Sequence, residues 1–204
     1  AYCLYTSGST GQPKGVLVGH PSLLNLCQWH NRTFEVSQNS TATLYAGVAF
    51  DASVWEMYPY LLAGATLCIV PEEVRLDIHL LGDFWRKNQV SHLFVPTALY
   101  NKVLPPDTFE GLPEVKVLVG GESLQAPKMP GIRLYNNYGP TENTVVTSFC
   151  EVKAENNSIG RPIDNVSVYI LDEKLQLLPY GAIGELCIGG LGLARGYLNR
   201  AELN

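Results

Sequence analysis

A loop near the start of the chain combines the residue types that bind phosphate. From Tyr5 to Gly15 it reads YTSGSTGQPKG, with four serine and threonine hydroxyls, three glycines and Lys14. Glycines let backbone N–H groups converge on an anion, and the hydroxyls and the lysine add donors and charge. The G-x-x-x-x-G-K-[ST] pattern of a Walker loop is absent. Composition alone leaves two interpretations open, a polyphosphate site and a solvated surface turn.

Asp51 is the second residue whose type could support chemistry. It precedes Ser53 and Glu56, which have the S-x-x-E spacing of a capping box, so we interpret those two as helix-start residues with Asp51 before the cap. A carboxylate at the exit of a strand could bind an ammonium group. Taken by itself, Asp51 is also explained by the structural role.

A third segment, Tyr138–Glu142, reads YGPTE. A tyrosine ring can stack on a purine, a threonine hydroxyl can donate to phosphate, and a glutamate can ligate Mg²⁺. The alternative is a turn, because Gly-Pro interrupts regular structure and Glu142 favours a helix N-terminus. Five further apolar residues are core residues by default: Trp55, Phe94, Leu118, Val145 and Val146.

Composition narrows the class of protein. The 204 residues are 46% hydrophobic and 16% charged, with a net charge of −5, which is typical of a soluble globular protein without a basic nucleic-acid surface. Charges, Gly or Pro interrupt every apolar run, so we expect no membrane span. The five cysteines form no C-x-x-C pair and the histidines no H-x-x-x-H pair, which argues against a zinc site or a disulfide framework. We therefore expect a reducing compartment, the cytoplasm.

The elements that would position these residues alternate along the chain. Strands are predicted at 44–48, 66–70, 90–95 and 115–119, with a short apolar run at 132–135. One helix is predicted after Pro21, and another one carries Val74, Ile78, Leu81 and Trp85 on one face. This alternation indicates an α/β fold with a parallel-rich sheet flanked by helices.

The pattern changes after residue 150. Strands are predicted at 166–171 and 185–188, and helical periodicity fades. We expect an α/β region over 1–150 and the start of a β-rich subdomain over 151–204. In open α/β sheets ligands bind beyond the carboxyl ends of strands, and the segments Phe50–Ser53, Gly120–Glu122 and Asn136–Glu142 all follow predicted strands.

Four segments in this order resemble one family. They are LYTSGSTGQPKG at 4–15, FDAS at 50–53, NYGPTE at 137–142, and GELCIGG followed by LARGYL at 184–190 and 193–198. Over its whole length the chain resembles the adenylation domains of nonribosomal peptide synthetases, within the adenylate-forming superfamily. The resemblance implies that ATP, Mg²⁺ and an amino acid bind together and form aminoacyl-AMP. The aminoacyl group would then pass to the phosphopantetheine thiol of a carrier domain, beside condensation domains of the same synthetase.

The resemblance also implies a role for each matching residue. Thr141, Glu142 and Lys14 would be catalytic, with Glu142 also holding Mg²⁺ and Asp51 pairing with the substrate ammonium group. The nucleotide would be bound by Thr6, Ser7, Gly8, Ser9, Thr10, Gly11, Lys14, Gly121, Asn136 and Tyr138. The amino-acid side chain would be bound by Ala52, Trp55, Phe94, Leu118, Gly120, Asn137, Val145 and Val146, a set that resembles the pattern associated with leucine.

The family pattern continues past what this chain contains. The expected Tyr-x-Thr-Gly-Asp segment, the hinge and the C-terminal subdomain with its lysine are absent from the 204 residues. We therefore expect a partial adenylation domain that is close to inactive in adenylation by itself. Two alternatives remain, a stand-alone acyl- or aryl-CoA ligase and a nucleotide-binding module without catalysis. Asp51 argues against the first, because acids without an amine need no such partner.

Overall fold

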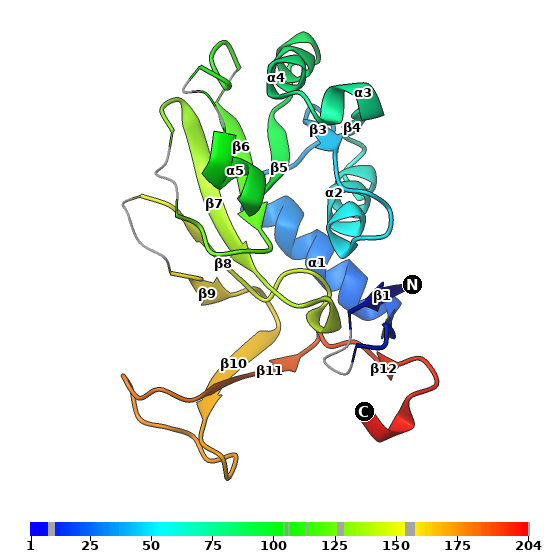
Figure 1. The fold of residues 1–204 in the computed structure, drawn as a ribbon, viewed down its shortest axis with the longest axis vertical. Helices are drawn as coiled ribbons and strands as arrows, with labels where there is room; N and C mark the ends of the chain where they lie inside the picture. The colour runs from blue at the N-terminus through cyan, green and yellow to red at the C-terminus, as the bar shows by residue number, and fades with distance from the viewer. Residues whose placement is uncertain are drawn as a thin grey trace.

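The computed structural model describes residues 1–7, 11–103, 105, 107–112, 114–125, 129–153 and 158–203 (Figure 1). Its main feature is a seven-stranded sheet in the order β4-β3-β5-β6-β7-β8-β9. The first five in that order run parallel, β8 pairs antiparallel with β7, and β9 pairs antiparallel with β8. The bounds are β3 Thr41–Leu44, β4 Thr66–Ile69, β5 His92–Pro96, β6 Val115–Gly120, β7 Ile132–Tyr138, β8 Ser148–Glu151 and β9 Arg161–Pro162. The predicted α/β fold with a parallel-rich sheet is confirmed.

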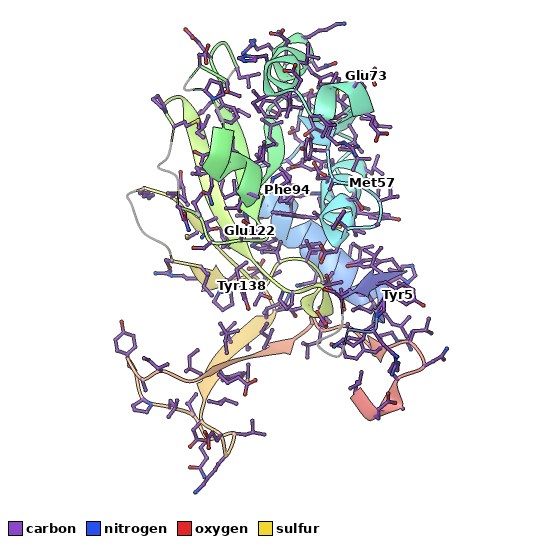
Figure 2. All side chains as sticks on the ribbon, viewed as in Figure 1. Tyr5, Met57, Glu73, Phe94, Glu122 and Tyr138 are labelled. Carbon is purple, nitrogen blue, oxygen red and sulfur yellow. The ribbon has the colours of Figure 1, made fainter. Side chains whose placement is uncertain are left out.

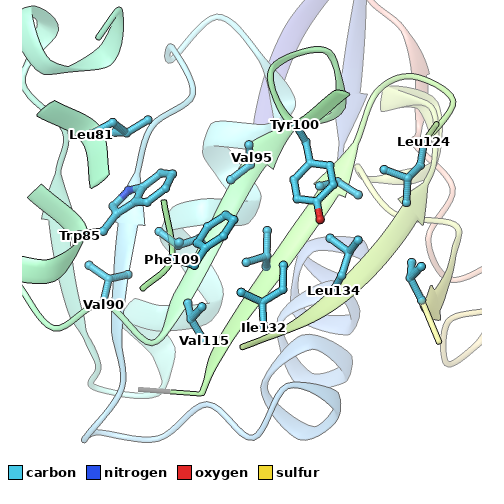
Figure 3. Close-up of a cluster of buried hydrophobic side chains, with 14 of the residues drawn as sticks. Leu81, Trp85, Val90, Val95, Tyr100, Phe109, Val115, Leu124, Ile132 and Leu134 are labelled. Carbon is cyan, nitrogen blue, oxygen red and sulfur yellow. The ribbon is translucent and has the colours of Figure 1, made fainter. Parts of the chain in front are cut away.

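Helices cover both faces of this sheet, because side chains along its central strands alternate between two apolar clusters. Leu93, Val95 and Val117 belong to a cluster that also contains Trp85 and Tyr100 (Figure 3). Those two come from α4 (Ile78–Lys87) and α5 (Thr97–Val103), which lie on one face.

The second cluster lies on the opposite face. Phe94, Leu118 and Tyr135 are neighbours across β5, β6 and β7, and they pack with residues of α1 (His20–Thr33) and α2 (Asp51–Leu62). This face carries the residues predicted to surround an amino-acid side chain, so its packing shapes the candidate site.

The ends of the chain build two smaller sheets. β1 (Tyr2–Thr6) and β2 (Lys14–Val18) are antiparallel, and β12 (Gly196–Tyr197) pairs with β2. β10 (Val166–Leu171) and β11 (Glu185–Gly190) form an antiparallel pair that projects from the body of the molecule (Figure 1). The predicted division near residue 150 falls inside β8, a strand of the large sheet. The division into subdomains stays a prediction.

Three local predictions were wrong for identifiable reasons. The strand predicted at 44–48 ends at Leu44, because the N–H groups of Tyr45 and Ala46 bond to the Glu56 carboxylate instead of to a neighbouring strand. The single helix predicted through Val74 and Trp85 is two helices, α3 (Glu72–Arg75) and α4. A new helix begins there because the Asp77 carboxylate accepts hydrogen bonds from the N–H groups of His79 and Leu80.

The capping-box interpretation was the third error. Helix α2 begins at Asp51, with Phe50 as its N-cap residue, so Asp51 lies inside the helix and not before the cap. The Ser53 hydroxyl donates to the Phe50 carbonyl oxygen at 2.7 Å. Glu56 turns inward, where it is 2% exposed. Among the helices that the structure describes, we find none with the length and apolar character needed to cross a bilayer.

Candidate active site

The predicted site residues gather at the carboxyl ends of the parallel strands, where open α/β sheets bind ligands. Pro96, Gly120 and Asn137 are neighbours across the ends of β5, β6 and β7. Figure 2 labels one residue at or near the end of each strand, Phe94, Glu122 and Tyr138. Side chains that are far apart in sequence are therefore presented along one edge.

Asp51 and Thr141 meet at this edge. Asp51 is the first residue of α2, and Thr141 begins a short 3₁₀ helix, η1 (Thr141–Asn143), that follows β7. The Thr141 hydroxyl donates to Asp51 Oδ2 at 2.5 Å. The residues predicted to bind an ammonium group and an α-phosphate are thus in direct contact, so two substrates bound to them would also be adjacent.

A small cavity opens beside Asp51. Its volume is about 90 Å³, well below the roughly 300–1,000 Å³ of whole-ligand pockets, and suited to one side chain. It is lined by Asp51, Ala52, Trp55, Phe94, Gly120, Gly121, Asn137, Gly139, Val145 and Val146. Leu118 does not line the cavity. It is 1% exposed and packs in the same apolar cluster as Trp55 and Val146.

The walls of this cavity are mainly apolar and rigid. The rings of Trp55 and Phe94 pack edge to face, with centroids 5.7 Å apart. Val145 adopts φ +69°, which a β-branched residue rarely does. Neighbouring contacts hold this backbone in place. Thr144 Oγ1 donates to the Gly192 carbonyl at 2.7 Å, and a Cβ added to Gly139 would lie 2.3 Å from the Val145 carbonyl oxygen. The cavity therefore has little freedom to expand.

A larger cavity of about 320 Å³ shares Gly121, Asn137 and Gly139 with the small one. Three residues predicted to border adenine line it, Gly121, Asn136 and Tyr138. Tyr138 is 39% exposed, and the Asn136 amide donates to the Ser158 carbonyl at 2.9 Å. The volume lies in the range of ligand pockets and could accept a purine base.

The predicted phosphate loop connects two paired strands. Thr6 pairs with Lys14 in the β1–β2 ladder, so Ser7 and Gly11 lie in the connection between these strands. Gly11 has φ +78°, and among the described residues no atom beyond its chain neighbours lies within 4 Å of the position its Cβ would take. Gly8, Ser9 and Thr10 lie outside the described residues. The Lys14 ammonium lies 4.7 Å from the centroid of the Tyr197 ring.

Glu142 is held beside this lysine by the same tyrosine. The Tyr197 hydroxyl donates to Glu142 Oε1 at 2.7 Å. Burial, together with this hydrogen bond, raises the pKa of Tyr197 to about 12, so the phenol remains a donor at neutral pH. Tyr197 occurs in the LARGYL motif, but its role depends on contacts across 55 residues of sequence, and no local spacing would have shown it.

The donor set around Glu142 fits Mg²⁺. Within the described part of the chain no group of three or more His, Cys, Asp or Glu side chains could form a metal cage. Mg²⁺ in nucleotide sites commonly takes one or two carboxylates, with phosphate oxygens and waters completing its shell. The Glu142 carboxylate, near the predicted phosphate loop, matches that requirement.

Glu56 was assigned to helix-start chemistry from its sequence spacing, but it shapes the site. Its carboxylate accepts hydrogen bonds from the N–H groups of Tyr45 (3.0 Å) and Ala46 (2.6 Å), which fixes the loop that leads to Asp51. Burial raises the pKa of Glu56 to about 8. The sequence spacing did not predict that the Glu56 side chain points inward.

Comparisons with known proteins agree with this geometry. A family model described as AMP-binding enzyme matches residues 1–198. The chain is 50% identical to bacitracin synthase 1 of Bacillus licheniformis, over 100% of this chain and 4% of that protein. It is 47% identical to surfactin synthase subunit 2 of Bacillus subtilis (strain 168), over 99% of this chain and 6% of that protein. The chain thus corresponds to a small part of each of these relatives.

Solved structures share the fold over the whole chain. The N-terminal subdomain of NpsA from Klebsiella oxytoca, solved with 3-hydroxyanthranilyl-AMSN, superposes with a TM-score of 0.86 at 28% identity, covering 100% of this chain and 55% of that one. AB3403, a four-domain nonribosomal peptide synthetase bound to AMP and glycine, gives a TM-score of 0.86 at 32% identity, covering 100% of this chain and 16% of that one.

Proposed function

Because this chain belongs to the AMP-binding enzyme family, we propose that it activates an amino acid as aminoacyl-AMP for nonribosomal peptide synthesis, with leucine as the preferred amino acid. The observation that carries the proposal is the position of Asp51 at the small cavity of about 90 Å³. A carboxylate beside an apolar space matches a substrate that has an ammonium group and an aliphatic side chain.

The proposed reaction joins two anions. A carboxylate oxygen of the amino acid attacks the α-phosphorus of ATP, a new O–P bond forms, and the bond to pyrophosphate breaks. Positioning and charge neutralisation must supply most of the rate enhancement in such a transfer. The contact between Asp51 and Thr141 supports this chemistry, because it brings the ammonium and α-phosphate subsites together.

The chain's own residues supply the remaining interactions. Tyr138 stacks on adenine, with Gly121 and Asn136 at the border of the same cavity. The loop from Thr6 to Lys14 binds the terminal phosphates, and Lys14 adds a positive charge. Glu142 holds Mg²⁺, which when bound neutralises charge on the phosphates.

The preference for leucine rests on the shape of the small cavity. Trp55 and Phe94 limit its size, and Ala52, Val145 and Val146 provide apolar contacts. Discrimination between aliphatic amino acids is intrinsically modest, because one methylene in an apolar pocket is worth about 1–3 kcal/mol. We therefore expect isoleucine, valine and methionine to be slower substrates.

The proposal extends to the larger protein. The relatives are peptide synthases of which this chain matches 4–6%, and AB3403 is a synthetase of four domains. We propose that the chain is part of an adenylation domain whose C-terminal subdomain completes the site. A carrier domain then takes the aminoacyl group on its phosphopantetheine thiol, beside a condensation domain. Division of the chain into an α/β region over 1–150 and a β-rich region over 151–204 belongs to this proposal.

The test is ATP–pyrophosphate exchange by the full-length enzyme that contains this chain. The panel should hold leucine, isoleucine, valine, methionine, glutamine and an aryl acid such as 3-hydroxybenzoate. We expect the highest rate with leucine. The highest rate with the aryl acid would favour an acyl- or aryl-CoA ligase, and nucleotide binding without any exchange would favour a module that does not catalyse.

A further inference from the structure

We infer that His30 is a positioning residue for amino-acid selection, because it holds the Trp55 indole so that only hydrocarbon faces the small cavity. This inference rests on the proposed function and identifies a residue outside the cavity that determines the shape and polarity of its wall. His30 does not line the cavity and belongs to none of the sequence motifs.

The inference starts from one hydrogen bond. Trp55 Nε1 donates to His30 Nδ1 at 2.8 Å, joining α2 to α1 across 25 residues of sequence. An indole N–H can only donate, so His30 Nδ1 accepts and the neutral imidazole carries its proton on Nε2. Trp55 is 2% exposed and His30 is fully buried, so this interaction has no competition from water.

His30 itself is fixed in a cage of aromatic rings. Its ring meets those of Phe34, Tyr60 and Trp55 edge to face, with centroids 4.8, 5.0 and 5.8 Å apart. Burial, together with the charge of nearby His92, lowers the pKa of His30 well below its ordinary value. The imidazole therefore stays neutral and keeps its acceptor toward Trp55.

The orientation of Trp55 decides what a substrate meets. With its N–H directed toward His30, the indole presents no donor to the cavity, and its other contact there is the edge-to-face packing with Phe94. A substrate side chain that needs a hydrogen-bond partner, such as that of glutamine, finds no donor on the Trp55 ring. An aliphatic side chain needs no such partner and binds without an unsatisfied polar group.

Loss of the acceptor would change the wall. A buried indole N–H without a partner is unfavourable, so the ring would turn toward the cavity or toward water. Either movement changes the shape of the cavity that accepts leucine. A movement toward the cavity also presents the indole N–H to an amide side chain of the substrate.

The experiment compares kcat/KM for leucine and glutamine in ATP–pyrophosphate exchange, using the full-length enzyme that contains this chain. We expect His30→Leu to lower the leucine-to-glutamine ratio about tenfold or more, because the unpaired indole N–H disfavours the orientation that fits leucine and, if turned to the cavity, offers a donor to glutamine. His30→Asn places an amide oxygen near the position of Nδ1, so it should restore most of the ratio.

His92 offers a matched control. It is also buried and packs against Tyr60, but its ring nitrogens bond to the Ser91 hydroxyl and the Phe34 carbonyl oxygen. His92→Leu should lower thermal stability as His30→Leu does, and yet leave the leucine-to-glutamine ratio unchanged.

A double-mutant cycle covers the case in which His30→Leu does not fold. Trp55→Phe removes the indole N–H that His30→Leu would leave unpaired, so His30→Leu should fold in that background and have no further effect on the ratio. The inference is overturned if His30→Leu keeps the wild-type ratio when Trp55 is present, if His30→Asn and His30→Leu lower it equally, or if His30→Leu changes it in the Trp55→Phe background. Failure of the proposed function gives a different result. In that case no amino acid in the panel would support ATP–pyrophosphate exchange by the wild-type enzyme.

Discussion

The hydroxyl of Thr141 donates a hydrogen bond of 2.5 Å to the carboxylate of Asp51, across 90 residues of sequence. Each residue is assigned a different substrate group under the proposed function, the α-phosphate for Thr141 and the ammonium group for Asp51. In this structure the two side chains satisfy each other. Binding at one subsite must therefore affect the other, and this contact is the basis of the first two predictions.

Asp51→Ala should reduce activation of leucine by on the order of 3–5 kcal/mol in transition-state stabilisation, because the substrate ammonium would be left without its charge partner. The desamino analogue 4-methylpentanoate has no ammonium group and should be affected far less. The measurement is kcat/KM in ATP–pyrophosphate exchange for both acids. Unchanged turnover of leucine by the variant would contradict the assigned role.

Thr141→Val should abolish an energetic coupling between leucine and ATP. When an ammonium group pairs with Asp51, the carboxylate attracts the Thr141 proton less, and the hydroxyl becomes available to the α-phosphate. Leucine should therefore tighten binding of a non-hydrolysable ATP analogue by about fivefold or more, and the analogue should tighten leucine equally. Calorimetric titration measures both. Thr141→Ser keeps the hydroxyl and should keep the coupling; equal coupling in Thr141→Val would disprove the mechanism.

Ala52→Leu should shift substrate preference toward smaller amino acids. The added side chain enters a cavity of about 90 Å³, and each methylene displaced is worth about 1–3 kcal/mol. The measurement is the alanine-to-leucine ratio of kcat/KM, which should rise. Ala63→Leu, at the C-cap of α2 and outside the cavity, is the control. Gly120 is a less clean position, because its added Cβ would lie 3.1 Å from the Asn137 carbonyl oxygen. The same ranking of amino acids in Ala52→Leu would show that the side chain binds elsewhere.

Tyr197→Phe should raise the Mg²⁺ concentration needed for half-maximal exchange about tenfold, because loss of a hydrogen bond to a charged group costs about 1.5 kcal/mol. The ring that packs with Lys14 remains, so the change isolates the hydroxyl that orients Glu142. Tyr180→Phe removes a hydroxyl from a fully exposed residue and serves as the control. An unchanged Mg²⁺ requirement in Tyr197→Phe would mean that the tyrosine does not position Glu142.

Glu56 should make stability depend on pH. Burial raises the pKa of Glu56 in the folded protein from the ordinary 4.5 to about 8. The contribution of this group to the free energy of unfolding is therefore fully present below about pH 4.5 and is lost as the pH rises toward 8. The free energy of unfolding should fall between pH 5 and pH 8. In Glu56→Gln this fall should be smaller by on the order of 3 kcal/mol. Urea unfolding of the purified chain at both values measures it. A slope equal to that of the unsubstituted chain would contradict the raised pKa.

Local sequence patterns predicted the elements well where the pattern and the tertiary packing agree. Strands β5, β6, β10 and β11 lie within a few residues of the predicted ranges, because apolar β-branched runs have few other ways to bury their side chains. Prediction failed at the end of β3, where the apolar run continued but Glu56 took the backbone N–H groups of Tyr45 and Ala46. A side chain from a later helix decided where that strand ends.

The same distinction applies to the candidate site. The residue types, their order and the family of the four motifs could be identified from the amino-acid chain alone. The contacts of Asp51 with Thr141, Tyr197 with Glu142 and His30 with Trp55 became evident from the folded structure. Hydrogen bonds require donor and acceptor within about 3 Å, and a pattern of residue types specifies only local spacing. Contacts between residues 90, 55 and 25 positions apart exist because the sheet and its helices bring those side chains together.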